Sequence, residues 1–188
     1  MKLFRKTEGI ANGTYFIGDE IEFILTNGEH IRAIGVKYEK SDVVFCSVDC
    51  LQTVYPMRKG KFSRRGYKRS DLRETLNTEI LDLFPPYLRE MLKPLDNGDF
   101  LRIPTEIEIF GYNHYGAQTE SHKEQWTPMR EPRYRVALQG IRGESWASYW
   151  LQNDVYDEKD LVAVVSAAGR VTYGDPFSGG GVRLVFKL

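Results

Sequence analysis

The sequence predicts an α+β protein with antiparallel sheets, two packed helices and long irregular loops. Three observations indicate this class. Residues 21–38 hold two strand-like runs around an Asn-Gly pair, residues 70–95 repeat apolar side chains at helical spacing, and residues 161–188 return to short strand-like runs. Because consecutive strands are usually neighbours, we expect these runs to pair antiparallel.

The first strands lie within residues 1–56, which we expect to form an N-terminal β-sheet. Asn27-Gly28 separates EFILT from EHIRAIGVKY, and this dipeptide favours a tight hairpin turn because both residues tolerate positive φ. A third apolar run, residues 43–48, is expected to pair with the hairpin.

Two helices are predicted next. Ser70 is a candidate N-cap, and the first helix ends before Pro85-Pro86. Pro86 suits the first turn of the second helix, which the turn signal at 96–98 closes. The apolar stripes of the two helices are formed by Leu72, Leu76, Ile80 and Phe84, and by Tyr87, Leu88, Met91, Leu92 and Leu95.

A strand-like run at 100–103 precedes a short helix. Thr105 and Glu108 have the spacing of a capping box, which predicts one helical turn to about Phe110 that stops at Gly111.

The C-terminal residues predict an antiparallel meander. Runs at 161–166 and 170–173 flank a turn at Ala168-Gly169, and a Gly-rich bend at 174–181 leads into a last strand with period two. Alternation along 146–151 places Trp146 and Trp150 on one face, and we assign Trp150 to the core.

Size and charge exclude some classes of function. A chain of 188 residues fits one domain, and its 26 basic and 26 acidic side chains give no overall attraction to nucleic acid or anionic membranes. No apolar run is long enough to span a bilayer, and the N-terminus lacks the apolar core of a secretory signal. We therefore expect a protein made in the cytoplasm that does not insert into membranes.

Cys46 and Cys50 have no partnering Cys or His pair nearby in the sequence, which makes them a poor zinc site. We interpret them as two small buried apolar residues.

Residues 57–69 form a basic loop. Seven Lys and Arg side chains occur between 58 and 69 without an acid, with Phe62 and Tyr67 among them. This is the candidate nucleic-acid or phosphate patch. The alternative is a solvated loop whose charge balances acids elsewhere.

The candidate binding residues lie in irregular segments. Residues 112–135 lack periodicity, and loops of this length are commonly functional or disordered. Tyr and Trp combine a large apolar face with a polar tip, as recognition surfaces require. With the loop 152–160 and the bend 174–181, the candidates are Tyr112, His114, Tyr115, Trp126, Tyr134, Asn153, Asp154, Tyr156 and Phe177.

Catalytic and metal-binding alternatives remain open. His114 and His122, with Glu120, Glu124 and Glu131 nearby, are a candidate metal site of an enzyme. The oxygens of Asn153, Asp154, Asp157, Glu158 and Asp160 could hold Ca²⁺, although such residues also form ordinary turns. The sequence has no Gly-x-Ser-x-Gly elbow. We expect no required cofactor and no catalysis.

Five motifs resemble those of an uncharacterised domain family of Gram-positive bacteria and their phages. They are Gly18-Asp19-Glu20-Ile21-Glu22-Phe23, the helix from Tyr67 to Asn77 (YKRSDLRETLN), Pro104-Thr105-Glu106-Ile107-Glu108-Ile109-Phe110-Gly111, Tyr149-Trp150-Leu151-Gln152 and Gly181-Val182-Arg183-Leu184. Gln152 replaces the usual Arg of the family, and Leu184 its usual Pro.

The resemblance implies a C-type-lectin-like fold over the C-terminal half of residues 70–188, similar to formylglycine-generating enzymes but without their catalytic cysteines. It implies a display scaffold with binding carried on its loops. The expected function is a non-enzymatic binding or assembly module, such as a phage tail, fibre or decoration protein located in the virion. Its partner would be a receptor protein, a glycan or a neighbouring virion protein, and the chain itself is expected to form a homo-oligomer or to take part in virion assembly.

Overall fold

The computed structural model describes residues 1–4, 15–60, 66–117, 124–140, 145–158 and 160–188. It mixes helices with antiparallel sheets, which confirms the α+β class. A five-stranded sheet has the order β1-β2-β3-β4-β12, with strands Lys2–Phe4, Glu20–Ile24, His30–Glu39, Asp42–Ser47 and Val185–Lys187. A three-stranded sheet has the order β10-β9-β8, with strands Val171–Gly174, Val162–Val165 and Tyr149–Asp154.

Two small sheets and several short helices complete the structure. The small sheets pair β11 with β5 and β6 with β7, with strands Gly179–Gly180, Tyr55–Pro56, Ala137–Gln139 and Ser145–Ala147. The helices are α1 (Asp71–Thr75), α2 (Pro86–Met91), α3 (Glu106–Phe110), the π-helical turn η2 (Leu76–Ile80) and the 3₁₀ turns η1 (Tyr67–Arg69), η3 (Thr127–Arg130) and η4 (Pro132–Tyr134).

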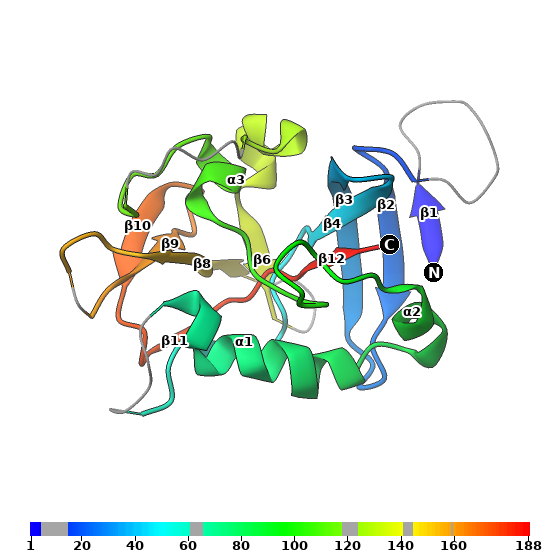
Figure 1. Cartoon of the computed structure of the whole chain (residues 1–188), viewed down its shortest axis with the longest axis horizontal. Helices are drawn as coiled ribbons and strands as arrows, with labels where there is room; N and C mark the ends of the chain where they lie inside the picture. The colour runs from blue at the N-terminus through cyan, green and yellow to red at the C-terminus, as the bar shows by residue number, and fades with distance from the viewer. Residues whose placement is uncertain (5–14, 61–65, 118–123, 141–144, 159) are drawn as a thin grey trace.

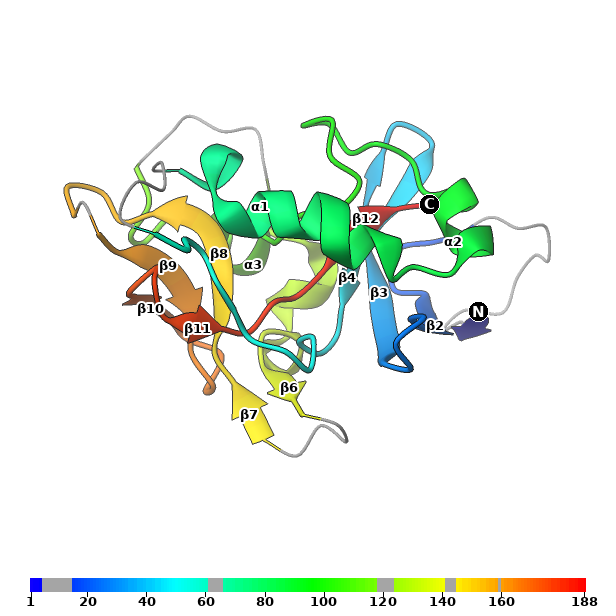
Figure 2. The ribbon, with the colours of Figure 1, turned by 90° about the horizontal axis from the view of Figure 1, so that it is seen from below.

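The two larger sheets lie side by side, with the α1–η2 helix running along both (Figures 1 and 2). One core contains the stripe Leu72, Leu76, Ile80 and Phe84 together with Trp150 and Phe186. The predicted helix stripe and the assignment of Trp150 to the core are therefore confirmed. A second core lies around α3, η3 and the opposite face of β8, where Tyr149 is buried.

The N-terminal hairpin forms as predicted, and β4 pairs with it. Its turn differs in one detail. Only Gly28 takes a positive φ, of 88°. Asn27 contributes through its side chain, whose Oδ1 accepts the N–H of Glu29 at 3.1 Å.

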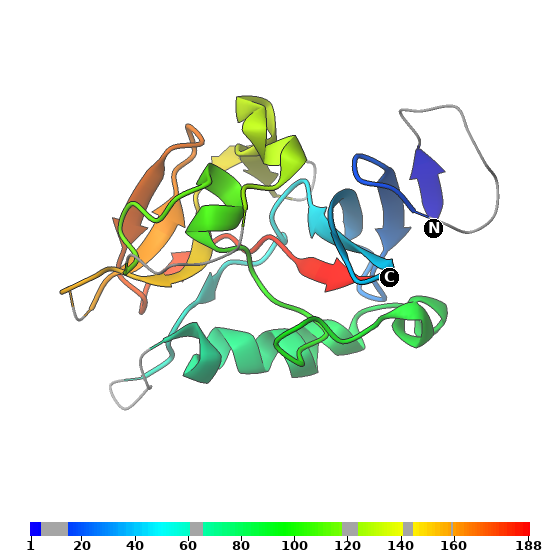
Figure 3. The ribbon, with the colours of Figure 1, turned by 45° about the horizontal axis from the view of Figure 1, so that its top comes forward.

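The predicted C-terminal meander is only partly correct. β9 and β10 form the expected hairpin, but β12 pairs with β4 in the other sheet. The Gly-rich bend is not a free connection either, because Gly179–Gly180 pairs with Tyr55–Pro56 and Gly181 bridges to Tyr149. With these contacts the chain runs from the three-stranded sheet to the five-stranded sheet, where it forms β12 (Figure 3).

The last strand is buried on both faces. Its period-two residues Val182, Leu184, Phe186 and Leu188 all lie in the first core, while Val185 lies in the second. β12 thus lies between the two cores. The alternation of apolar residues predicted which side chains share a face, but it did not predict that β12 pairs with β4.

The α1–η2 helix fixes the segment that follows α2. Ser70 caps the helix as predicted, accepting the N–H of Arg73 at 3.1 Å. Arg73 makes two 2.7 Å bonds to the carboxylate of Asp99. Asn77 accepts the N–H groups of Phe100 and Leu101 at 2.9 and 3.0 Å. The strand-like run at 100–103 is thus paired only in part: the Asn77 side chain takes the N–H groups of Phe100 and Leu101, whereas Arg102 forms an antiparallel bridge with Val185 of β12.

Candidate functional site

Four rings contact one another in sequence on the surface. The ring centroids of Tyr112 and His114 lie 6.3 Å apart, those of His114 and Tyr115 4.6 Å, and those of Tyr115 and Tyr173 5.3 Å. All three pairs meet edge to face, which is a favourable geometry for aromatic rings. We call Tyr112, His114, Tyr115 and Tyr173 the aromatic ridge. Tyr112, His114 and Tyr173 are exposed and Tyr115 is half-buried.

Tyr156 flanks the ridge. Its backbone N–H donates to the carbonyl of Tyr115 at 2.7 Å, and its side chain is 66% exposed. The structure thus brings together four of the predicted binding residues from two loops. The sequence prediction missed Tyr173, because it lies on a strand-like run outside the candidate loops and its exposure and contact with Tyr115 arise only from the tertiary structure.

The ridge is held from below by a buried carboxylate. Thr105 and Glu108 form the predicted capping box of α3, and Gly111 ends the helix in the left-handed conformation. The chain then folds back over the start of α3. There the fully buried Glu106 accepts the N–H groups of Tyr115 at 3.0 Å and Gly116 at 2.7 Å.

An amide pair completes this support. Asn153 accepts the N–H of Glu106 at 2.9 Å and donates to Asn113 at 3.3 Å. Asn113 in turn donates to the carbonyl of Ala117 at 2.7 Å. A Cβ on Gly116 would lie 2.6 Å from the amide nitrogen of Asn153, so this position needs glycine. Asn153, a predicted binding residue, is therefore a support of the loop.

A hollow of about 210 Å³ lies on the other face of β10. It is lined by Ser148, Tyr149, Trp150, Val164, Thr172, Tyr173, Gly174, Asp175, Ser178, Gly179 and Gly180. The Trp150 ring lies beneath the bend and donates to the carbonyl of Tyr55 at 2.7 Å. A Cβ on Gly180 would lie 2.5 Å from this ring, which explains why the bend is rich in glycine.

Other predicted binding residues lie elsewhere. Trp126 is 3% exposed, with the Arg102 guanidinium over its ring, and Tyr134 is also buried. Both predictions are corrected, because these rings fill the second core. Phe177 is 45% exposed on the bend, where its N–H donates to Asp175 at 3.0 Å. Trp146, which alternation placed with Trp150, is exposed.

The basic loop contributes one charge to the interior. Arg58 is buried, and its guanidinium donates to the carboxylate of Asp154 at 3.2 Å. Because Arg58 is paired in the interior, it cannot contribute to a phosphate-binding surface. Asp154, a predicted binding residue, stabilises the fold through the same pair. Residues 61–65 of the basic loop lie outside the described part of the chain.

The described residues contain no cluster of three or more His, Cys, Asp and Glu side chains placed to hold a metal ion. His114 belongs to the ridge, whereas His122 and Glu120 fall outside the described residues. No helix within the described part of the chain is long and apolar enough to cross a membrane.

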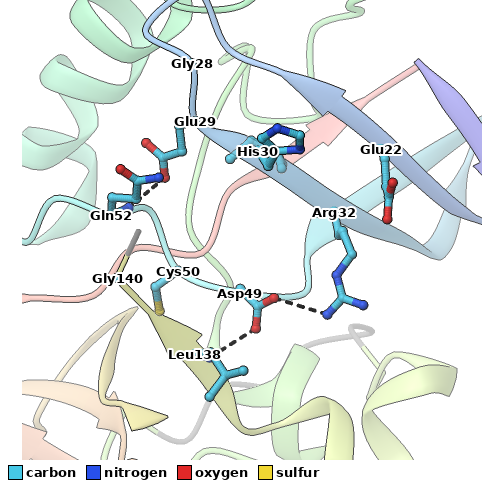
Figure 4. Close-up of a pocket in the computed structure, with 11 residues that line it drawn as sticks. Glu22, Gly28, Glu29, His30, Arg32, Asp49, Cys50, Gln52, Leu138 and Gly140 are labelled. Atoms are coloured by element: carbon cyan, nitrogen blue, oxygen red, sulfur yellow. Dashed lines mark hydrogen bonds and ion pairs between the residues drawn. The ribbon is translucent and has the colours of Figure 1, made fainter. Parts of the chain in front are cut away.

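A hollow of about 600 Å³ lies beside the N-terminal hairpin (Figure 4). Three of its charged side chains, Glu29, Arg32 and Asp49, are engaged with the protein. Arg32 and Asp49 form an ion pair at 3.2 Å, and Asp49 also accepts the N–H of Leu138 at 3.1 Å. Glu29 accepts the N–H of Gln52 at 2.6 Å, and burial raises the pKa of its carboxyl group. No residue of this hollow was predicted as a site.

Cys50 also lines this hollow. Burial raises the pKa of its thiol to about 12, so the thiol is protonated at neutral pH and is a weak nucleophile. Burial raises the pKa of Cys46 as well. Both thiols are free and buried, which confirms the interpretation as small core residues.

No protein-family model, curated protein or solved structure matches this chain.

Proposed function

We propose that the protein is a non-enzymatic binding or assembly module that presents the aromatic ridge and Tyr156 to the surface of a partner macromolecule. The observation that carries this proposal is a row of four aromatic rings, three of them exposed, of which Tyr112, His114 and Tyr115 lie on a loop fixed by the buried Glu106.

Exposed aromatic residues are favourable binding anchors. A Tyr side chain offers a large apolar face and a hydroxyl group, and it has few rotatable bonds to immobilise. The loop that carries Tyr115 is fixed by Glu106 before any partner arrives. Such preorganisation reduces the entropic cost of binding.

The wider context of this proposal comes from the five sequence motifs. Their resemblance supports a C-type-lectin-like display scaffold and, for the whole protein, a tail, fibre or decoration protein of a phage virion. In this proposal the chain forms a homo-oligomer or assembles with neighbouring virion proteins. Its loops would contact a host receptor, a glycan or another virion protein.

Two panels of probes test the binding function. The purified chain is applied to an array of bacterial cell-surface glycans and to a displayed library of random heptapeptides. We expect ligands from at least one panel, with affinity reduced at least about tenfold in the Tyr112→Ala/Tyr156→Ala double variant, equivalent to the loss of about 1.4 kcal/mol of binding free energy.

Tyr38→Ala is the matched control, because Tyr38 is 49% exposed on β3 and lies outside the ridge. Its affinity should stay within about twofold of the wild type. The proposal is contradicted if neither panel yields a ligand, or if the double variant binds every ligand as well as the wild type does.

A further inference from the structure

The β10 strand has an open edge. It is the end strand of the three-stranded sheet, and Ser166 donates to the carbonyl of Arg170 at 2.7 Å just before it. Hydrogen-bonded and non-bonded pairs alternate along an antiparallel ladder, so the N–H and C=O groups of Val171 and Tyr173 point away from β9. No backbone bond within the described part of the chain uses these four groups.

Two other sheet edges, those of β8 and β12, are covered. Along β8, Trp150 donates to the carbonyl of Gly181 at 3.1 Å, and Gly181 donates to Ser148 at 3.0 Å. Along β12, Val185 exchanges two bonds with Arg102. By contrast, β10 has the sequence Val-Thr-Tyr-Gly, without the charge, proline or bulge that commonly protects an exposed edge.

The two faces beside this edge differ. The side chains of Thr172 and Tyr173 point to opposite faces of the strand. The Tyr173 ring joins the aromatic ridge, and Thr172 lines the 210 Å³ hollow with Trp150, a hollow that Tyr173 also borders. An added strand would direct successive side chains to opposite faces, toward the ridge and toward the hollow in turn. The edge therefore offers main-chain bonds for affinity and two different surfaces for side-chain selection.

We propose that β10 takes up an extended polypeptide segment of the partner as a fourth strand. This inference rests on the proposed binding function and deepens it, because it assigns the partner to the polypeptides. Val171 and Tyr173 present their outward N–H and C=O groups about 7 Å apart, which is the two-residue repeat of a strand. A glycan has no matching row of alternating donors and acceptors. Trp150 and Val164 favour an apolar side chain of the peptide in the hollow.

The test uses the random heptapeptide library with the full chain. We expect selected peptides that lose at least about tenfold in affinity when alternate backbone nitrogens are methylated, because methylation removes main-chain donors without changing side chains. The amides of Val171 and Tyr173 should become protected from hydrogen exchange when such a peptide is bound.

A variant of the protein tests the same main-chain hydrogen bonds by changing β10 instead of the peptide. Val171→Pro removes an outward N–H that the sheet does not use and should weaken binding at least about tenfold, while Val171→Thr keeps that N–H and should bind within about threefold. The methylated peptides need no protein variant, so a folding defect in Val171→Pro leaves the test intact.

The outcomes separate the two proposals. Ligands that depend on Tyr112 and Tyr156 but tolerate methylation, or glycans as the only ligands, overturn the added strand and leave the binding function standing. The absence of ligands from both panels overturns both.

Discussion

The carboxylate of Glu106, in the first turn of α3, accepts the backbone N–H of Gly116 ten residues later at 2.7 Å. The same carboxylate accepts the N–H of Tyr115 at 3.0 Å. One buried side chain thus sets the position of the loop that carries most of the aromatic ridge. The ridge therefore depends on a residue that lies beneath the surface and is not itself part of the ridge.

Replacement of Glu106 should loosen the ridge. Glu106→Ala leaves the buried N–H of Gly116 and the partly buried N–H of Tyr115 without an acceptor, and we expect a loss of about 2–4 kcal/mol in the free energy of unfolding. Amide exchange of residues 112–117 should accelerate in the same variant. Glu131→Ala is the control, because Glu131 forms an exposed pair with Arg133 and should change stability by no more than about 1 kcal/mol. Unchanged exchange in Glu106→Ala contradicts the role of the carboxylate.

Arg183 should be among the most sensitive positions. Its guanidinium is fully buried and donates to the carbonyls of Ser47 at 2.7 Å and Tyr134 at 2.8 Å. Arg183→Lys cannot reproduce this geometry, and we expect a loss of about 3 kcal/mol or more, measured by chemical denaturation. Arg170→Lys, on the exposed turn before β10, should stay within about 0.5 kcal/mol of the wild type. Equal stability of the two variants would count against the role of Arg183.

Glu39 should make stability depend on acid pH. Burial raises the pKa of its carboxyl group, but hydrogen bonds from Lys187, Lys37 and the N–H of Asp96 outweigh burial and lower the pKa from 4.5 to about 2. The ionised form therefore stabilises the fold fully above pH 4.5, and this contribution is lost as the pH falls from 4.5 to 2.

The comparison that checks this effect is wild type against Glu39→Gln. Gln cannot ionise, so the variant should be less stable at pH 7, and the gap in melting temperature should narrow steadily between pH 4.5 and 2. A gap that stays constant across this range would show that Glu39 is not the titrating group.

The cysteines should resist alkylation in the native state. With a thiol pKa of about 12, Cys50 is ionised in only about one molecule in ten thousand at pH 8. Mass spectrometry after iodoacetamide treatment should show no modification of either cysteine in native protein. Both should be modified in concentrated guanidinium chloride, which is the positive control. Rapid native labelling would indicate that the hollow beside Cys50 opens in solution.

Local signals in the sequence were sufficient for much of the fold. The Ser70 cap, the Thr105–Glu108 capping box and the Asn27-Gly28 hairpin depend on neighbours within a few residues, and all three form. The apolar periods also gave the buried faces of the helix and the last strand. These features need no knowledge of distant contacts.

The site was predicted less well. Aromatic content selected the correct loop, but it could not separate exposed Tyr112 from buried Trp126, because both are large amphipathic residues in aperiodic segments. The acceptor oxygens of Asn153 and Asp154 suggested cation binding, whereas the fold commits them to Glu106 and Arg58. The sequence shows which functional groups are present, whereas burial and internal hydrogen bonds determine which of them can contact a ligand.

The sequence by itself determined the α+β class, the caps of the α1–η2 helix and α3, and the inward face of the α1–η2 helix, because each follows from backbone preferences and apolar spacing over short distances. The second helix was predicted to reach the turn at 96–98, but α2 ends at Met91, and Tyr87 and Met91 of its predicted stripe are exposed. Only the tertiary structure decided that β12 joins β4, that Tyr173 completes the ridge and that β10 keeps an open edge. The physical reason is that strand pairing and edge exposure depend on which distant segments compete for the same backbone groups. Gly181 takes the edge of β8 and Arg102 that of β12, while β10 has no such partner within the described residues.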